Sequence, residues 1–231
     1  MKHLDAGRTV EALAITSKLV LRDPDTIETL ERHAIVLLAQ AVKLEGNGEV
    51  EQSQRRREEA LEAYLSACNL SGVTGGTQFS AAQLAHMLGK IKIAIPLYEK
   101  ANETLPNDGR SSLWLSQIYL LEENWESANR WIELSLKRQP SDPFTLISAG
   151  LIKANLNDCK AAKNYTFTAI KHRPRDEDIR LMQARIFRIC DEPARALELL
   201  YSLSTTLRNS ELVDQEISMC NKLIGRSQSE Y

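Results

Sequence analysis

The chain has 231 residues, of which 43% are hydrophobic and 6% aromatic, and its formal net charge is −2. This composition can bury one extended core, and it lacks the basic excess that nucleic-acid-binding domains usually carry. No apolar stretch approaches the roughly 18 residues that a membrane-spanning helix requires. The amino terminus lacks the apolar segment of a secretory signal, so we expect a cytoplasmic protein with no membrane partner.

A spacing of about 34 residues recurs along the sequence, and a fixed period between about 20 and 50 residues is the signature of a stacked-repeat protein. Three sets of residues keep it: Leu84, Ile118, Ile152, Ile186 and Cys220; Ala94, Ala128, Ala162 and Ala196; Pro106, Pro140 and Pro174. Apolar residues within each period follow helical spacing, and proline ends the second helix. We therefore predict an all-α solenoid built from helix–turn–helix repeats.

The predicted elements run from one half-repeat to another. Residues 1–26 fit the second helix of a repeat, and residues 27–74 fit a repeat with about fourteen extra residues. Four repeats follow, at 75–108, 109–142, 143–176 and 177–208. The first helix of a further repeat is predicted at 209–224, with Gly225 as its C-cap and 226–231 as a frayed tail. Together, residues 1–225 are expected to form a single solenoid.

The extra length falls within Ala34–Ala60, on both sides of the turn Glu45–Gly48. Both flanks are rich in helix formers, so we expect two helices longer than those of repeat 109–142. The linker Asn69–Thr77 contains three glycines and is predicted to be the most flexible joint.

Met1 enters in the middle of a repeat, so the natural chain either starts there or extends upstream. Residues 1–6 are expected to be weakly ordered or covered by a second copy, as in a homodimer through the N-terminal end.

The register resembles the tetratricopeptide repeat, whose consensus has about 34 residues. The resemblance rests on the alanine column, the terminal prolines and a column of small residues, and it covers roughly residues 4–224. The small column is Ala82, Ser116, Gly150 and Ala184. The resemblance implies a right-handed α-solenoid whose first helices line a concave groove for protein or peptide partners. Among the residues that it places in that groove, eight are the expected partner contacts: Phe79, Gln83, Leu113, Gln117, Ile147, Leu151, Arg185 and Arg188.

The groove residues suggest the chemistry of a partner. Leu113, Ile147 and Leu151 are not needed for the repeat columns, so they offer an apolar wall. Arg185 and Arg188 lie one turn apart and would suit an acidic group on the partner. The alternative is that these side chains only pack against neighbouring first helices or a missing domain.

One activity of the family is not expected here. Its co-chaperone members hold a C-terminal carboxylate with Lys and Asn in the groove. The equivalent pairs in this chain are Phe79 with Gln83 and Leu113 with Gln117, which do not supply those groups.

No motif predicts catalysis, a cofactor or a metal site. The glycine-rich segment 72–77 lacks the Gly-Lys-Ser/Thr of a phosphate loop and follows a helix. The four histidines have no metal-ligand spacing. The four cysteines, Cys68, Cys159, Cys190 and Cys220, are far apart, and we expect free buried thiols and a reducing compartment rather than disulfides or a metal.

The sequence therefore predicts a non-catalytic scaffold or adaptor that binds a peptide or protein element. The alternative is the helical targeting region of a larger enzyme, such as a glycosyl- or sulfo-transferase, whose catalytic part is absent. Residues Arg55–Arg57, followed by two glutamates, are interpreted as a solvated helix face rather than a nucleic-acid contact.

Overall fold

The computed structural model describes residues 9–23, 26–204 and 211–229. Within these residues the chain forms twelve helices and no strand. They fall into two compact units, residues 1–106 and 107–231. None of the described helices is long and apolar enough to cross a membrane.

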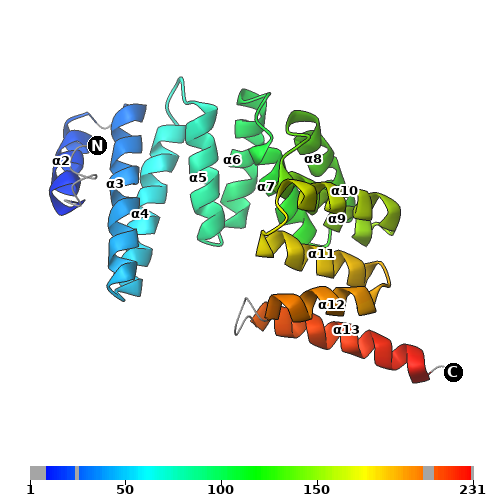
Figure 1. The fold of residues 1–231 in the computed structure, drawn as a ribbon. Coiled ribbons are helices and arrows are strands. Elements are labelled where there is room, and N and C mark those ends of the chain that lie inside the picture. The colour runs from blue at the N-terminus through cyan, green and yellow to red at the C-terminus, as the bar shows by residue number, and fades with distance from the viewer. Residues whose placement is uncertain (1–8, 24–25, 205–210, 230–231) are drawn as a thin grey trace. The chain divides into compact units, whose positions relative to one another are not determined.

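The first unit holds the helices α2 to α6, which follow one another side by side in chain order (Figure 1). Their bounds are Thr9–Arg22 for α2, Ile27–Gly46 for α3, Val50–Cys68 for α4, Gly75–Met87 for α5 and Ile91–Thr104 for α6.

The second unit holds α7 to α13. Their bounds are Arg110–Leu121 for α7, Trp125–Arg138 for α8, Pro143–Asn155 for α9, Cys159–His172 for α10, Glu177–Ile189 for α11, Pro193–Ser204 for α12 and Glu211–Ser229 for α13. Pairs of first and second helices alternate along the unit, and Pro140 and Pro174 lie in the connections between pairs.

The periodic residues of the sequence form the core. Four members of the apolar column, Leu84, Ile118, Ile152 and Ile186, are at most 4% exposed, and Cys220 is fully buried. All four residues of the alanine column have 0% exposure. Small side chains let the paired helices approach closely, and the larger ones fill the space between pairs at the density of a protein interior.

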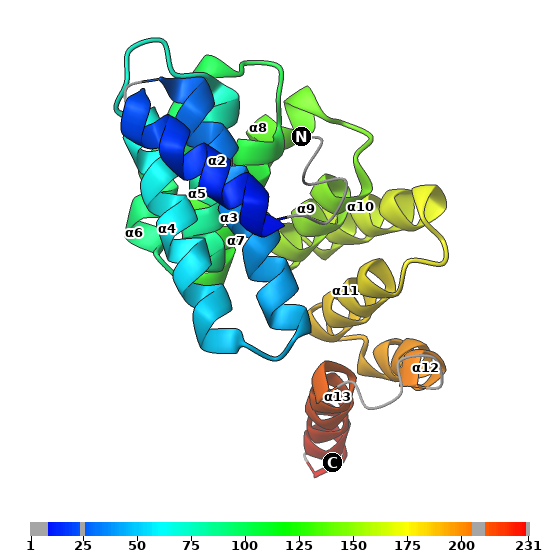
Figure 2. The same ribbon diagram turned by 90° about the vertical axis from the view of Figure 1, so that its left-hand side faces the viewer.

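The prediction that two helices here are longer than those of repeat 109–142 is confirmed. Helices α3 and α4 have 20 and 19 residues, against 12 and 14 in α7 and α8. Both extend beyond the ends of α5 and α6, and the turn at their tip joins them as a hairpin (Figures 1 and 2). The hydroxyl of Ser53 donates to the carbonyl of Ala41 at 2.8 Å, and Arg57 pairs with Glu45 across the hairpin. Arg56 also pairs with Glu59, so two of the three clustered arginines bind glutamates of the same hairpin.

The predicted linker Asn69–Thr77 is shorter than expected, because residues 75–77 belong to α5. The hydroxyl of Thr74 accepts the amide of Thr77 at 3.1 Å and caps α5, which begins at Gly75. A Cβ atom on Gly75 would lie 2.4 Å from Oγ1 of Thr104 and 2.6 Å from Cγ of Leu105. This glycine therefore serves close packing of α5 against the end of α6, not freedom of the joint.

The last helix is longer than predicted. Helix α13 continues through Gly225 to Ser229, so the predicted cap at Gly225 and the tail from residue 226 are wrong. Glycine is tolerated inside a helix at a modest cost, and here the helical pattern continues past it.

The prediction for residues 1–6 lies outside the described residues. Ile15 in α2 is 47% exposed, and the homodimer through this end stays a prediction, as does the single continuous solenoid.

Two cysteines overturn the expectation of free thiols. Cys159 at the start of α10 and Cys190 at the end of α11 form a disulfide with a Cα–Cα distance of 5.6 Å. Their separation of 31 residues is close to one repeat, which brings the start of one second helix beside the end of the next first helix. Cys68 and Cys220 are free thiols, and of the two only Cys220 is buried as predicted, whereas Cys68 is half-buried. The argument for a reducing compartment therefore loses its basis.

The tight turns within the repeats share a backbone conformation that the sequence did not reveal. Gly89, Glu123, Asn157 and Asp191 recur at the repeat period and have φ values of 70°, 56°, 61° and 59°. In each turn the backbone amide of the residue after the left-handed one donates a hydrogen bond to the carbonyl five residues before it. The amide of Asn124, for example, donates to the carbonyl of Tyr119 at 2.9 Å. This is the Schellman pattern that closes helices with a left-handed residue. Glycine adopts this conformation freely, asparagine and aspartate tolerate it, and glutamate does so at a cost.

The first prediction concerns the alanine column. Ala128 packs with Ile132, Ala149 and Ile152 and has 0% exposure, so Ala128→Leu should overpack this cluster. We expect a loss of about 1–3 kcal/mol in the free energy of unfolding, measured by thermal and denaturant melts. The matched control is Ala194→Leu on the exposed face of α12, which should change little. Equal midpoints for the wild type and Ala128→Leu would show that the register is wrong.

The second prediction concerns the turn at Glu123. Glu123→Gly should raise the free energy of unfolding by about 1 kcal/mol, because it relieves a left-handed conformation that costs L-residues about 1–2 kcal/mol. The reciprocal change, Gly89→Glu, should lower it, although a Cβ atom at Gly89 would meet no atom within 4 Å. Glu122→Gly is the control, since residue 122 has an ordinary φ of −81° and glycine would relieve no strain there. Similar effects of Glu122→Gly and Glu123→Gly in denaturant melts would contradict the assignment.

Candidate functional site

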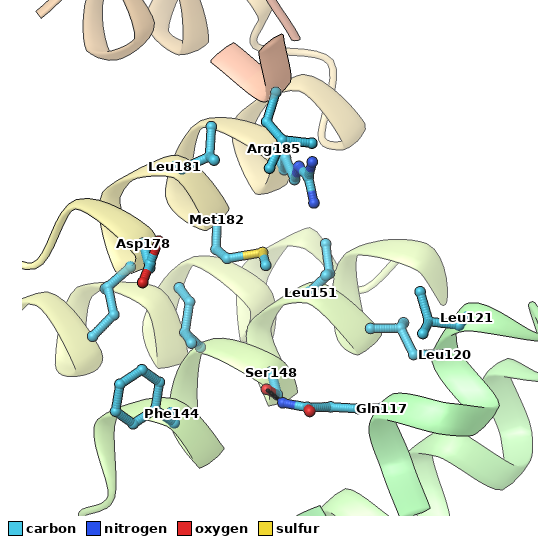
Figure 3. Close-up of a pocket in the computed structure, with 13 residues that line it drawn as sticks. Gln117, Leu120, Leu121, Phe144, Ser148, Leu151, Asp178, Leu181, Met182 and Arg185 are labelled. Carbon is cyan, nitrogen blue, oxygen red and sulfur yellow. Dashed lines mark hydrogen bonds between the residues drawn. The ribbon is translucent and has the colours of Figure 1, made fainter. Parts of the chain in front are cut away.

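A cavity of about 440 Å³ lies in the second unit, on the face formed by its first helices (Figure 3). Its walls come from α7, α9 and α11, and the first turn of α13 contributes Leu212. The volume falls within the range of about 300–1,000 Å³ that is typical of ligand sites.

Most of the lining residues fall on columns of the repeat period. The columns are Gln117, Leu151 and Arg185; Phe144, Asp178 and Leu212; Ile147 and Leu181; Ser148 and Met182. Leu120, Leu121 and Ile179 complete the lining. Positions separated by three, four and seven residues share one helix face, so α9 and α11 each present the same face to the cavity.

Apolar side chains are exposed around the cavity. Leu121 is 79% exposed, Leu212 is 51% exposed and Phe144 is 40% exposed. Single exposed apolar residues are ordinary, but several around one hollow form the kind of patch that marks an interaction site. The guanidinium of Arg173 lies over the Phe144 ring, 5.1 Å from its centre, in a cation–π contact.

The cavity lining contains few polar side chains: Gln117, Ser148, Asp178 and Arg185. The amide nitrogen of Gln117 donates to the hydroxyl of Ser148 at 3.3 Å, which links α7 to α9 (Figure 3). Asp178 and Arg185 are the charged residues of the lining. Asp178 is exposed and forms no ion pair with any residue that the structure describes.

Arg185 and Arg188 are already paired, because Glu216 of α13 forms an ion pair with each of them. Nε of Arg185 lies 2.7 Å from one carboxylate oxygen, in an ion pair without the alignment of a hydrogen bond. Nε of Arg188 donates to the other oxygen at 2.8 Å. The side chain of Glu216 is only 5% exposed, whereas the arginines are 26% and 21% exposed. The expectation that both arginines await an acidic partner group is thus corrected: α13 already supplies one carboxylate.

The third prediction tests this ion pair. Arg188→Gln should lower the free energy of unfolding, because it removes the hydrogen-bonded partner of a buried carboxylate. The loss should be about 2 kcal/mol, below the roughly 3–5 kcal/mol of fully buried pairs, since Arg188 is partly exposed. Adding Glu216→Gln should recover part of the loss, which a double-mutant cycle of denaturant melts would measure. Additive effects would show that the pair is not coupled.

The structure brings half of the predicted groove residues to the cavity. Gln117, Ile147, Leu151 and Arg185 line it, although Ile147 is only 4% exposed and also packs in the core. Leu113 instead packs against the cluster of Ala128 and Ile132, and Arg188 pairs with Glu216 outside the lining.

The other two predicted residues belong to the first unit. Phe79 is 7% exposed, and its ring centre lies 5.8 Å from that of Tyr98, so it packs in the core. Gln83 is exposed.

Several lining residues were missed by the sequence analysis, although the period carried a signal for some. Asp178 and Leu212 follow Phe144 at one and two periods, and Met182 follows Ser148. Extending the column of Phe144 into the last helix would have found Leu212. Leu121 has no counterpart in the lining one or two periods later, where Asn155 and Ile189 stand.

Comparison with solved structures shows the fold. A tetratricopeptide repeat protein from Parabacteroides merdae aligns with a TM-score of 0.70 and 15% identity, over 99% of this chain and 89% of that one. YrrB, described as a tetratricopeptide repeat protein with an unusual peptide-binding site, aligns with a TM-score of 0.52 and 16% identity, over 87% of this chain and 96% of its own. Cut9-Hcn1, an APC/C hetero-tetramer, aligns with a TM-score of 0.60 and 14% identity over 92% of this chain. This chain spans 52% of the length of that one.

The chain thus has the fold of tetratricopeptide repeat proteins, as its sequence register predicts. No model of a protein family matches the sequence. No curated protein matches it either.

Proposed function

We propose that this chain is a non-catalytic scaffold that holds a peptide or protein element in the cavity of its second unit. The proposal rests on one observation: a cavity of about 440 Å³ is surrounded by exposed apolar side chains. Burying a large apolar side chain contributes roughly 1.5–3 kcal/mol, so two or three anchors would give measurable affinity. The peptide-binding site ascribed to YrrB, which shares the fold, supports the same use of the scaffold here.

The proposed partner carries an acidic group that lies near Arg185. Arg185 lines the cavity, and its side chain is 26% exposed beside Leu151 and Met182 (Figure 3). One carboxylate, that of Glu216, balances two arginines, so this cluster keeps a net charge of +1. An acidic group would therefore add to the cluster rather than replace Glu216. The role as the targeting region of a larger enzyme stays an alternative, and no described feature favours it.

The fourth prediction tests the cavity as the peptide site. Random peptides displayed on phage are selected on the purified full chain, and enriched peptides are measured by fluorescence anisotropy. Leu121→Glu should weaken their binding about ten-fold or more, because it places a charge among the apolar contacts, and ten-fold corresponds to about 1.4 kcal/mol. Leu121 is 79% exposed, so the substitution leaves the fold intact.

The matched control for this prediction is Leu21→Glu in α2. Leu21 is 83% exposed and belongs to the first unit, so binding should be unchanged. The proposal fails if the wild type enriches no peptides, or if both variants lose binding equally.

A further inference from the structure

The two charged residues of the cavity stand at opposite ends of one helix face. Asp178 lies in the first turn of α11 and Arg185 two turns later, and seven residues of helix separate them by about 10 Å. Met182 lies between them in Figure 3, so the surface between the charges is apolar. Leu181 and Ile179, from the same helix, also line the cavity.

These charges have opposite signs and different surroundings. Asp178 carries −1 and has no ion-pair partner among the residues that the structure describes. The cluster of Arg185, Arg188 and Glu216 carries +1. The cavity is therefore electrically polarised along α11, negative at the start of the helix and positive toward its end.

We infer that the cavity binds an amphipathic peptide segment in one direction, with a basic residue against Asp178 and an acidic residue toward Arg185. This inference rests on the proposed function and adds the charge pattern of its partner. Charges complementary across an interface fix register and exclude partners of the wrong sign more than they add affinity. Apolar side chains between the two charges fill the hollow lined by Leu151, Met182 and Phe144.

The separation of the charges predicts the spacing in the partner. An extended chain advances about 3.4 Å per residue, so its basic and acidic residues would be three positions apart. A helical segment advances about 1.5 Å per residue, so they would be seven positions apart. Both alternatives share the same order of charges relative to α11, and the enriched peptides would show which spacing occurs.

The test compares two charge reversals in the same helical turn. Asp178→Lys reverses the charge at the cavity, and Glu177→Lys is the control, because Glu177 lies in the same first turn and does not line the cavity. Both variants lose the same favourable interaction of an acidic side chain with the helix N-terminus, so their stability should fall by similar amounts. Binding is measured by anisotropy on the full chain, with peptides enriched on the wild type.

Three results are expected. The enriched peptides should contain a basic residue three or seven positions from an acidic one. Asp178→Lys should weaken their binding about three- to ten-fold, an effect that shrinks at high salt because the site is partly exposed, and Glu177→Lys should change it less than two-fold. Replacing the basic residue of the peptide by glutamate should restore binding to Asp178→Lys and weaken binding to the wild type.

The outcomes separate this inference from the proposed function. Peptides that lose binding with Leu121→Glu but respond equally to Asp178→Lys and Glu177→Lys would overturn the charge pattern and leave the cavity as the site. Enrichment of peptides without charged residues would also overturn the charge pattern and leave the cavity as the site. Failure of the wild type to enrich any peptide would overturn both.

Discussion

The close approach of paired helices at the small columns is the constraint on which the rest of the structure depends. Ala94, Ala128, Ala162 and Ala196 are fully buried, and Gly150 leaves no room for a Cβ atom, which would lie 2.8 Å from Oγ1 of Thr166 and 3.1 Å from the carbonyl oxygen of Ala162. Because each helix pair meets its partner in the same way, the same helix positions face outward in every repeat. The columns of the cavity are a consequence of that repetition.

The turn inside each repeat preserves this geometry. A left-handed residue at the same position in the four turns reverses the chain in a fixed number of residues, and the amide of the next residue donates to a carbonyl of the preceding helix. Glycine, asparagine and aspartate meet this requirement at Gly89, Asn157 and Asp191, whereas Glu123 meets it against its preference. The period therefore depends on backbone geometry as much as on apolar packing.

Ion pairs within the chain neutralise part of the charge on the repeated face of the second unit. Arg185 and Arg188 lie on the face of α11 that would be open at the end of an array, and α13 covers it with the buried carboxylate of Glu216. The ion pairs join the last helix to the preceding repeat and also reduce the positive charge at one end of the cavity. Under the proposed function, stability and recognition would be linked at this end of the second unit, whereas Asp178 takes no part in the ion pairs of the described residues.

The sequence by itself determined the helix pairs, the buried columns, the long helices around Gly48 and the residues Gln117, Ile147, Leu151 and Arg185 of the cavity. The helix pairs, the buried columns and the long helices follow from local helical spacing or from the repeat period. The cavity residues follow from the resemblance to the tetratricopeptide repeat, in which the first helices line a groove. Only the tertiary structure decided that Phe79 packs on Tyr98, that Glu216 lies between two arginines and that Cys159 meets Cys190. These outcomes depend on which side chains of different helices come within a few ångströms, and periodicity gives the face of a side chain but not its partner.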